Sequence, residues 1–211
     1  MLKINKKIMI KKIGKQIYNY SLFFKKNILI IDTSTDMQIV ILTYEQNILD
    51  ININIKAKSF VSCMIPLINN ILKNNSIDLF NIQKIIVGCG PGSYTGTKIG
   101  VLTSKLLALE LKIPLFKISS LLLLSSGFDQ NVLTPKIKIN KDYFYALSFQ
   151  NNKIILKESR YSSDFLVNYQ NHILLSSLNY KISLYKIFNH LNIVNNPHEL
   201  SPNYYCFSWG Y

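Results

Sequence analysis

KIIVGCGPGSYTGTKIG, residues 84–100, is the stretch of sequence that decides the fold. It opens with Ile85-Ile86-Val87, an apolar β-branched run typical of a buried strand, and leads into residues 95–111, where apolar residues recur at helical spacing. Five of the chain's eight glycines lie in this stretch, and glycine tolerates tight turns and close backbone approach. The stretch therefore predicts a strand, a glycine-rich turn and a helix capped by Ser93 or Thr95.

A strand that feeds a turn and a helix N-terminus is also a place where proteins bind phosphate. The spacing departs from both common phosphate motifs. A Walker A loop requires Gly-Lys-Ser/Thr, but Thr97 separates Gly96 from Lys98, and Ser93 stands where the dinucleotide fingerprint requires glycine or alanine. A structural turn and an anion site both stay open at this point.

The composition indicates a chain with a substantial core. Its 211 residues allow one large or two small domains, and 48% of them are hydrophobic. Cys63, Cys89 and Cys206 fit neither a disulfide framework nor a zinc site, which is typical of a reducing cytosol. No apolar run is long enough for a membrane span or a secretory signal, so we expect a cytoplasmic protein.

The net charge of +13 is concentrated in residues 1–26, which hold eight lysines and no acid. The apolar residues there lie three or four positions apart, as on one helical face: Ile10, Ile13, Ile17, Tyr20 and Phe24. We predict a basic extension, disordered or helical. Such an arm could contact RNA or an anionic surface, and a frayed terminus is the alternative.

The remaining chain alternates strands and helices. The pattern predicts strands at 27–32, 38–44, 48–55, 85–87, 113–118, 133–139, 143–150, 153–158 and 172–175. It predicts helices at 60–72, 95–111, 120–124, 163–169 and 182–191. Both halves run from strands to helices, which indicates two similar lobes, residues 27–127 and a smaller, degenerate lobe at 128–211.

The motifs resemble the bacterial TsaB family, also called YeaZ. Asp32-Thr33-Ser34 ends the first strand as in that family, and the motif loop matches at Gly90, Pro91, Gly92, Ser93, Thr95 and Gly96. The resemblance covers residues 27–124 well and the rest weakly. It implies an α/β, actin-like fold, shared with Hsp70 and sugar kinases, with two lobes that each hold a mixed sheet flanked by helices.

The resemblance also implies a role in forming N6-threonylcarbamoyladenosine at position 37 of tRNAs that decode ANN codons. The family member is a non-catalytic scaffold that pairs with a TsaD-type catalytic subunit, joined by a TsaE-type ATPase. It implies no catalytic residue, metal or cofactor of the chain's own, with ATP or ADP only at the level of the complex. Contact with tRNA would be indirect or through the basic arm, and a homodimer is the other assembly.

The expected partner surface lies on the helices at 60–72 and 95–111, which carry apolar residues on more than one face. Small residues at Gly100, Ser104 and Ala108 would let helices approach closely. The residues expected at the surface are Met64, Ile68, Ile99, Leu102, Leu106 and Leu109. Phe60-Val61-Ser62 replaces the family's His-Ser-Glu, and Lys138-Ile139-Asn140 replaces a charged set, so sites built from those polar residues are in doubt.

An active phosphotransferase or ATPase of the actin-like fold is the alternative function. Asp32, Thr33 and Ser34 would then bind a metal–phosphate, although capping of a turn explains Asp32 equally well. A peptidase ranks last, because no nucleophile has a base nearby in the sequence. The three histidines, His172, His190 and His198, form no metal-binding pair.

Overall fold

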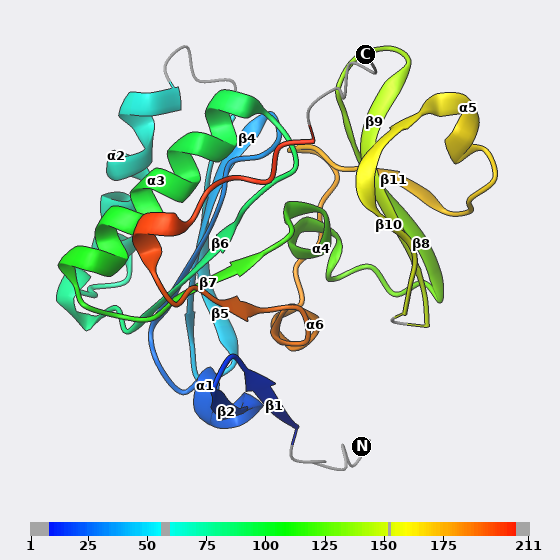
Figure 1. Cartoon of the computed structure of the whole chain (residues 1–211). Coiled ribbons are helices and arrows are strands. Elements are labelled where there is room, and N and C mark those ends of the chain that lie inside the picture. The colour runs from blue at the N-terminus through cyan, green and yellow to red at the C-terminus, as the bar shows by residue number, and fades with distance from the viewer. Residues whose placement is uncertain (1–8, 56–59, 152, 206–211) are drawn as a thin grey trace.

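The computed structural model describes residues 9–55, 60–151 and 153–205, and of Phe60 and Val61 the backbone only. A six-stranded sheet has the order β12-β7-β6-β3-β4-β5 and a four-stranded sheet the order β10-β9-β8-β11 (Figure 1). The strands of the first sheet are β3 (Ile28–Asp32), β4 (Met37–Tyr44), β5 (Asn47–Ile55), β6 (Lys84–Gly88), β7 (Leu115–Ile118) and β12 (Asn192–Ile193). Those of the second are β8 (Val132–Lys138), β9 (Tyr143–Gln150), β10 (Lys153–Ser162) and β11 (His172–Leu174).

Both sheets are mixed. β3 pairs antiparallel with β4 and parallel with β6, while β8 pairs antiparallel with β9 and parallel with β11. Every residue of β3 and β6 is buried, as their continuous apolar sequence predicts for strands covered on both faces. The predicted α/β fold with mixed sheets flanked by helices is confirmed.

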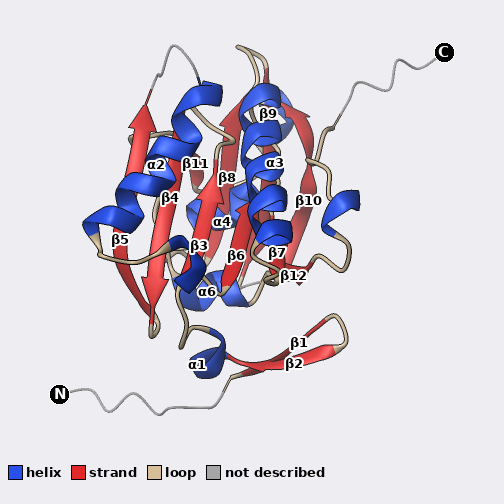
Figure 2. Ribbon diagram, turned by 90° about the vertical axis from the view of Figure 1, so that its left-hand side faces the viewer, coloured by secondary structure: helices blue, strands red, loops and turns tan. Residues whose placement is uncertain are grey.

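Helices cover the six-stranded sheet on both faces. α2 (Phe60–Asn74) and α3 (Tyr94–Glu110) lie side by side on one face (Figure 2), over a core that includes Leu29 and Ile31. Alternate residues of the same strand, Ile28 and Ile30, point to the other face, since side chains alternate along a strand. There α4 (Ser120–Ser125) and α6 (Leu184–Phe188) help to build one core with residues of the four-stranded sheet.

The N-terminal region differs from the predicted disordered or helical extension. Its described part forms a hairpin of β1 (Ile10–Ile13) and β2 (Gln16–Asn19), followed by the short helix α1 (Tyr20–Phe23). Gly14 takes φ +64° in the hairpin turn, a conformation that glycine adopts without strain. Ile13, Phe23 and Phe24 are buried, so tertiary packing overrides the helical spacing. Residues 1–8 lie outside the described residues.

The C-terminal region crosses back between the sheets. α5 (Ser163–Leu166) follows β10 in the second lobe, but β12 pairs antiparallel with β7 at the edge of the first sheet. The following residues, up to Tyr205, lie against the motif at the end of β6, where Asn203 N donates to Cys89 O over 2.7 Å. The four-stranded sheet thus spans residues 132–174, and the tail of the chain belongs spatially to both sheets.

Candidate functional site

The glycine-rich motif lies against the turn that follows β3. Ser93 caps α3 through a hydrogen bond from Gly96 N to its hydroxyl, so of the two predicted caps Ser93 is the one used. Ser93 N donates to Ser34 O over 2.7 Å, and Thr33 Oγ1 donates to Gly96 O over 2.7 Å. These contacts join the glycine-rich motif and the turn after β3, which are far apart in the sequence, into one hydrogen-bonded unit.

The motif glycines make room for that turn. A Cβ atom at Gly92 would lie 2.1 Å from Ser34 O, and one at Gly96 would lie 2.1 Å from Thr33 O. At Gly100 it would lie 2.3 Å from Thr33 Oγ1. Since backbone atoms occupy the space over Gly92 and Gly96 and the Thr33 side chain that over Gly100, the geometry favours the structural turn over a phosphate cradle.

Asp32 is buried at the centre of this unit. Its Oδ1 accepts hydrogen bonds from Ser34 N over 2.9 Å and from Ser34 Oγ over 2.7 Å. Its Oδ2 faces Gly88 and the Ser120 hydroxyl, and has no hydrogen-bond partner of good geometry among the described residues. Burial raises the pKa of Asp32, while the hydroxyls of Ser120 and Ser34 oppose that rise. The arrangement is that of a turn-capping carboxylate.

A cavity of about 250 Å³ opens beside the turn, between the two sheets. Ser34, Thr35 and Ser93 line it from the first lobe, and Lys138 lines it from the second. The Thr35 hydroxyl is buried and has no hydrogen-bond partner within the described part of the chain. A helix N-terminus and a lysine favour an anion here. The Asp36 carboxylate also lines the cavity and accepts hydrogen bonds from Ser177, which opposes an anion, and the Asp32 carboxylate is not part of the lining.

The helix pair exposes fewer of the predicted partner residues than expected. Leu102 and Leu106 are exposed by 52% and 59%, and Ile99 and Leu109 are half-buried. Met64 and Ile68 are a correction, because both are buried and pack on the sheet beneath α2. The prediction that Gly100, Ser104 and Ala108 let a partner helix approach is also wrong, because all three residues are buried.

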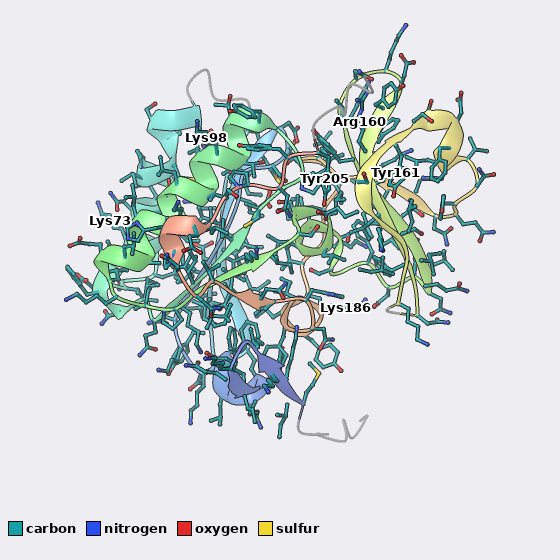
Figure 3. All side chains as sticks on the ribbon, viewed as in Figure 1. Lys73, Lys98, Arg160, Tyr161, Lys186 and Tyr205 are labelled. Atoms are coloured by element: carbon teal, nitrogen blue, oxygen red, sulfur yellow. The ribbon has the colours of Figure 1, made fainter. Side chains whose placement is uncertain are left out.

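Sequence reasoning missed Ile65, which α2 exposes by 51%. Two lysines lie on the side of the molecule that α2 and α3 cover: Lys73 projects from α2 and Lys98 from α3 (Figure 3). Lys98 Nζ lies 5.8 Å from the centre of the Tyr94 ring, and Tyr94 stacks on Tyr204 with 4.8 Å between ring centroids. The outer face of the pair is therefore aliphatic along α3 and aromatic at its N-terminus.

Glu158 of β10 is a second residue that the sequence did not single out. Tyr205 OH donates to its Oε1 over 2.9 Å and Ser119 Oγ donates to its Oε2, so it ties three separate segments together. Burial raises the pKa of Glu158. Burial also raises the pKa of the nearby Cys89 thiol to about 12, which keeps that thiol protonated at neutral pH.

Within the described residues, no three His, Cys, Asp or Glu side chains gather in a way that could hold a metal ion. No helix among them is long and apolar enough to cross a membrane. Lys138-Ile139-Asn140 begins at the last residue of β8, with Lys138 at the cavity described above. The side chains of Phe60 and Val61, and Cys206, lie outside the described part of the chain.

Two mixed sheets, a buried Asp-Thr-Ser turn and a glycine-rich strand-to-helix motif define an α/β protein of the actin-like class. The structure is similar to that of an uncharacterized protein with similarity to peptidase YeaZ from Pseudomonas aeruginosa, with a TM-score of 0.71 and 18% identity, over 86% of this chain and 100% of that one. YeaZ from Pseudomonas aeruginosa matches with a TM-score of 0.54 and 22% identity, over 65% of this chain and 68% of that one.

The sequence comparisons find similarity to proteins of tRNA threonylcarbamoyladenosine biosynthesis. A family model described as TsaD, tRNA N6-adenosine threonylcarbamoyltransferase, matches residues 51–137. The tRNA threonylcarbamoyladenosine biosynthesis protein TsaB of Bacillus subtilis is 31% identical over 134 residues, 62% of this chain and 58% of the relative. TsaB of Buchnera aphidicola subsp. Schizaphis graminum is 35% identical over 98 residues, 46% of each chain. The chain spans about half the length of these curated relatives, and over the matched residues it is similar to the TsaB proteins.

Proposed function

We propose that this chain takes part in tRNA threonylcarbamoyladenosine biosynthesis as a non-catalytic subunit that pairs with a TsaD-type catalytic subunit. The observation that carries the proposal is the outer face of α3, where Leu102 and Leu106 are exposed one turn apart. The names of the proteins that this chain resembles supply the pathway. The proposal includes a TsaE-type ATPase as a further partner and ATP or ADP bound at the level of the complex. It places the protein in the cytoplasm.

The physical argument concerns the two faces of α3. Its inner face is already buried against β6 and β3 through Val101, Ser104 and Ala108, so the helix needs no further packing within the chain. The two leucines are a little more than half exposed, so covering what remains of each would contribute about 1–2 kcal/mol. Ile65 on the neighbouring helix extends the apolar surface. A two-helix face of this kind suits a second pair of helices.

Binding measurements with purified proteins test this pairing. We expect Leu102→Lys with Leu106→Lys to weaken binding to a TsaD-type subunit by about 30-fold or more, because each lysine would place an unpaired charge in an apolar interface. Val167→Lys with Leu178→Lys is the matched control, since these residues are exposed by 77% and 93% on the other lobe. Equal affinity of both double variants for the subunit would exclude this surface. Self-association lost with the leucines would indicate a homodimer instead.

An active phosphotransferase or ATPase is the second candidate. The cavity lined by Thr35, Ser93 and Lys138 supports it, because a helix N-terminus and a lysine meet there. The burial of Asp32 weighs against it, since a carboxylate that caps its own turn is not free to hold a metal–phosphate. Nucleotide turnover by the isolated chain that falls with Thr35→Val, while the melting temperature is kept, would favour this candidate.

A further inference from the structure

The described part of the N-terminal region, residues 9–26, is termed the N-terminal arm below. It is fixed to the body of the protein by two lysines. Lys11 Nζ donates to three backbone carbonyls at the end of α6, including that of Phe188 over 3.2 Å. Lys84 of β6 donates to Phe23 O over 2.6 Å and lies 4.1 Å from the centre of the Phe23 ring. These contacts occupy the inward side of the arm.

An aromatic cluster completes the attachment. Tyr18 and Phe23 of the arm pack edge-on against Phe116 of β7, with ring centroids 5.8 and 5.0 Å apart. Phe23 also contacts Phe188 of α6 over 5.4 Å. Pairs of this geometry stabilise by about 0.5–1.5 kcal/mol beyond the area they bury. The arm therefore has a defined orientation on the protein.

The outward side of the arm is cationic. Lys12 and Lys15 of the hairpin, and Lys25 and Lys26 after α1, are all exposed. None of the four has an acidic partner among the described residues. The arm itself contains no acid. Four fixed positive charges on one short segment form a surface suited to a polyanion.

The arm lies at the opposite end of the six-stranded sheet from the glycine-rich motif, below α2 and α3 (Figures 1 and 2). We propose that the outer side of the N-terminal arm binds the phosphate backbone of RNA. The choice of tRNA as that RNA depends on the proposed function, which supplies tRNA as the polyanion near this chain.

Salt-dependent binding of the full-length chain to unmodified tRNA tests the inference. Four lysine–phosphate contacts predict a log–log salt slope of about 3, so their contribution should fall about 50-fold between 50 and 200 mM salt. A variant with Lys12, Lys15, Lys25 and Lys26 changed to glutamine should lose that part of the slope. The control removes the same charge elsewhere, at the exposed residues Lys112, Lys141, Lys153 and Lys157.

The outcomes separate the competing explanations. Equal tRNA affinities of the two quadruple variants, or no tRNA binding by the wild-type chain, would overturn the inference. So would arm-dependent binding to phosphatidylserine vesicles without arm-dependent binding to tRNA, because Ile10 and Ile17 are also exposed on the arm. Pairing with a TsaD-type subunit is measured in parallel. If the arm variant keeps both normal pairing and normal tRNA binding, the arm inference is disproved and the proposed function stands.

Discussion

Replacing Gly96 or Gly100 with alanine tests whether the glycine-rich motif is a packing device. At Gly96 the added methyl group would lie 2.1 Å from the backbone oxygen of Thr33, and at Gly100 it would lie 2.3 Å from the Thr33 side-chain oxygen. Carbon and oxygen atoms in contact are normally more than 3 Å apart. The clash at Gly96 can be relieved only if the backbone moves. The clash at Gly100 would be relieved by removing the Thr33 hydroxyl.

The expected cost follows from these contacts. Overpacking costs about 1–3 kcal/mol, and a backbone shift at Gly96 also weakens the bonds Thr33 Oγ1 to Gly96 O and Ser93 N to Ser34 O, each about 0.5–1.5 kcal/mol. Alanine regains about 1 kcal/mol of helix propensity. We therefore expect Gly96→Ala to lower the free energy of unfolding by about 3 kcal/mol, or the melting temperature by roughly 6–12 °C.

Thermal and urea unfolding monitored by circular dichroism provide the assay. Gly100→Ala should cost less in a Thr33→Ala background than in the wild type, because the remaining Thr33 atoms lie at 3.4 Å. Gly96→Ala should cost nearly as much in either background, since its clash is with the Thr33 backbone. Ser104→Ala in the same helix is the control, since its buried hydroxyl has no partner among the described residues. A Gly96→Ala protein as stable as the wild type, or rescued equally by Thr33→Ala, would refute the packing argument.

Three further measurements address buried titratable groups. Burial lowers the pKa of Lys84 to about 8, so the unfolded chain binds more protons between pH 8 and 10.5. The contribution of Lys84 to the free energy of unfolding should therefore rise over that window, and Lys84→Met should abolish the rise. The comparison is made in a Cys89→Ser background, because the buried thiol contributes the opposite slope above its ordinary pKa. Burial raises the pKa of Glu158 in the folded state. The carboxyl group therefore adds to the free energy of unfolding below its ordinary pKa, and this contribution is lost as pH rises through the pKa of the folded state. Glu158→Gln should remove that loss, measured by urea unfolding at several pH values. Cys89 should resist alkylation in the native state while the half-buried Cys63 reacts, and equal rates would contradict its burial.

The sequence sufficed for the fold where local pattern and tertiary packing agree. The buried strands around Ile31 and Val87, the Ser93 cap and the helix from Tyr94 could all be predicted, because apolar runs and caps determine those elements locally. The N-terminal arm could not. Its three- and four-residue spacing also fits a hairpin that turns at Gly14, and the aromatic contacts of Phe23 with distant residues decide between the two.

The candidate site was predictable only in part. Matching motifs identified the turn and the glycines, but not that they pack on each other, because that contact joins residues more than sixty positions apart. Met64 and Ile68 were assigned to a partner surface because an apolar stripe does not reveal whether its own sheet or another chain covers it. Glu158 carries no local signal, since its partners Ser119 and Tyr205 meet it only in three dimensions.

α3 connects the motif with the proposed partner surface. Its first turn is fixed on Thr33 through Gly96, and Leu106 lies about 15 Å further along the same helix, at 1.5 Å per residue. A helix of this length moves as a unit, so displacing its first turn displaces the leucine face. A folded Gly96→Ala protein should therefore bind a TsaD-type subunit more weakly than wild type even well below its melting temperature, whereas Ser104→Ala should bind normally. Unchanged binding by a measurably destabilised Gly96→Ala protein would mean that the motif stabilises the fold without positioning the partner surface.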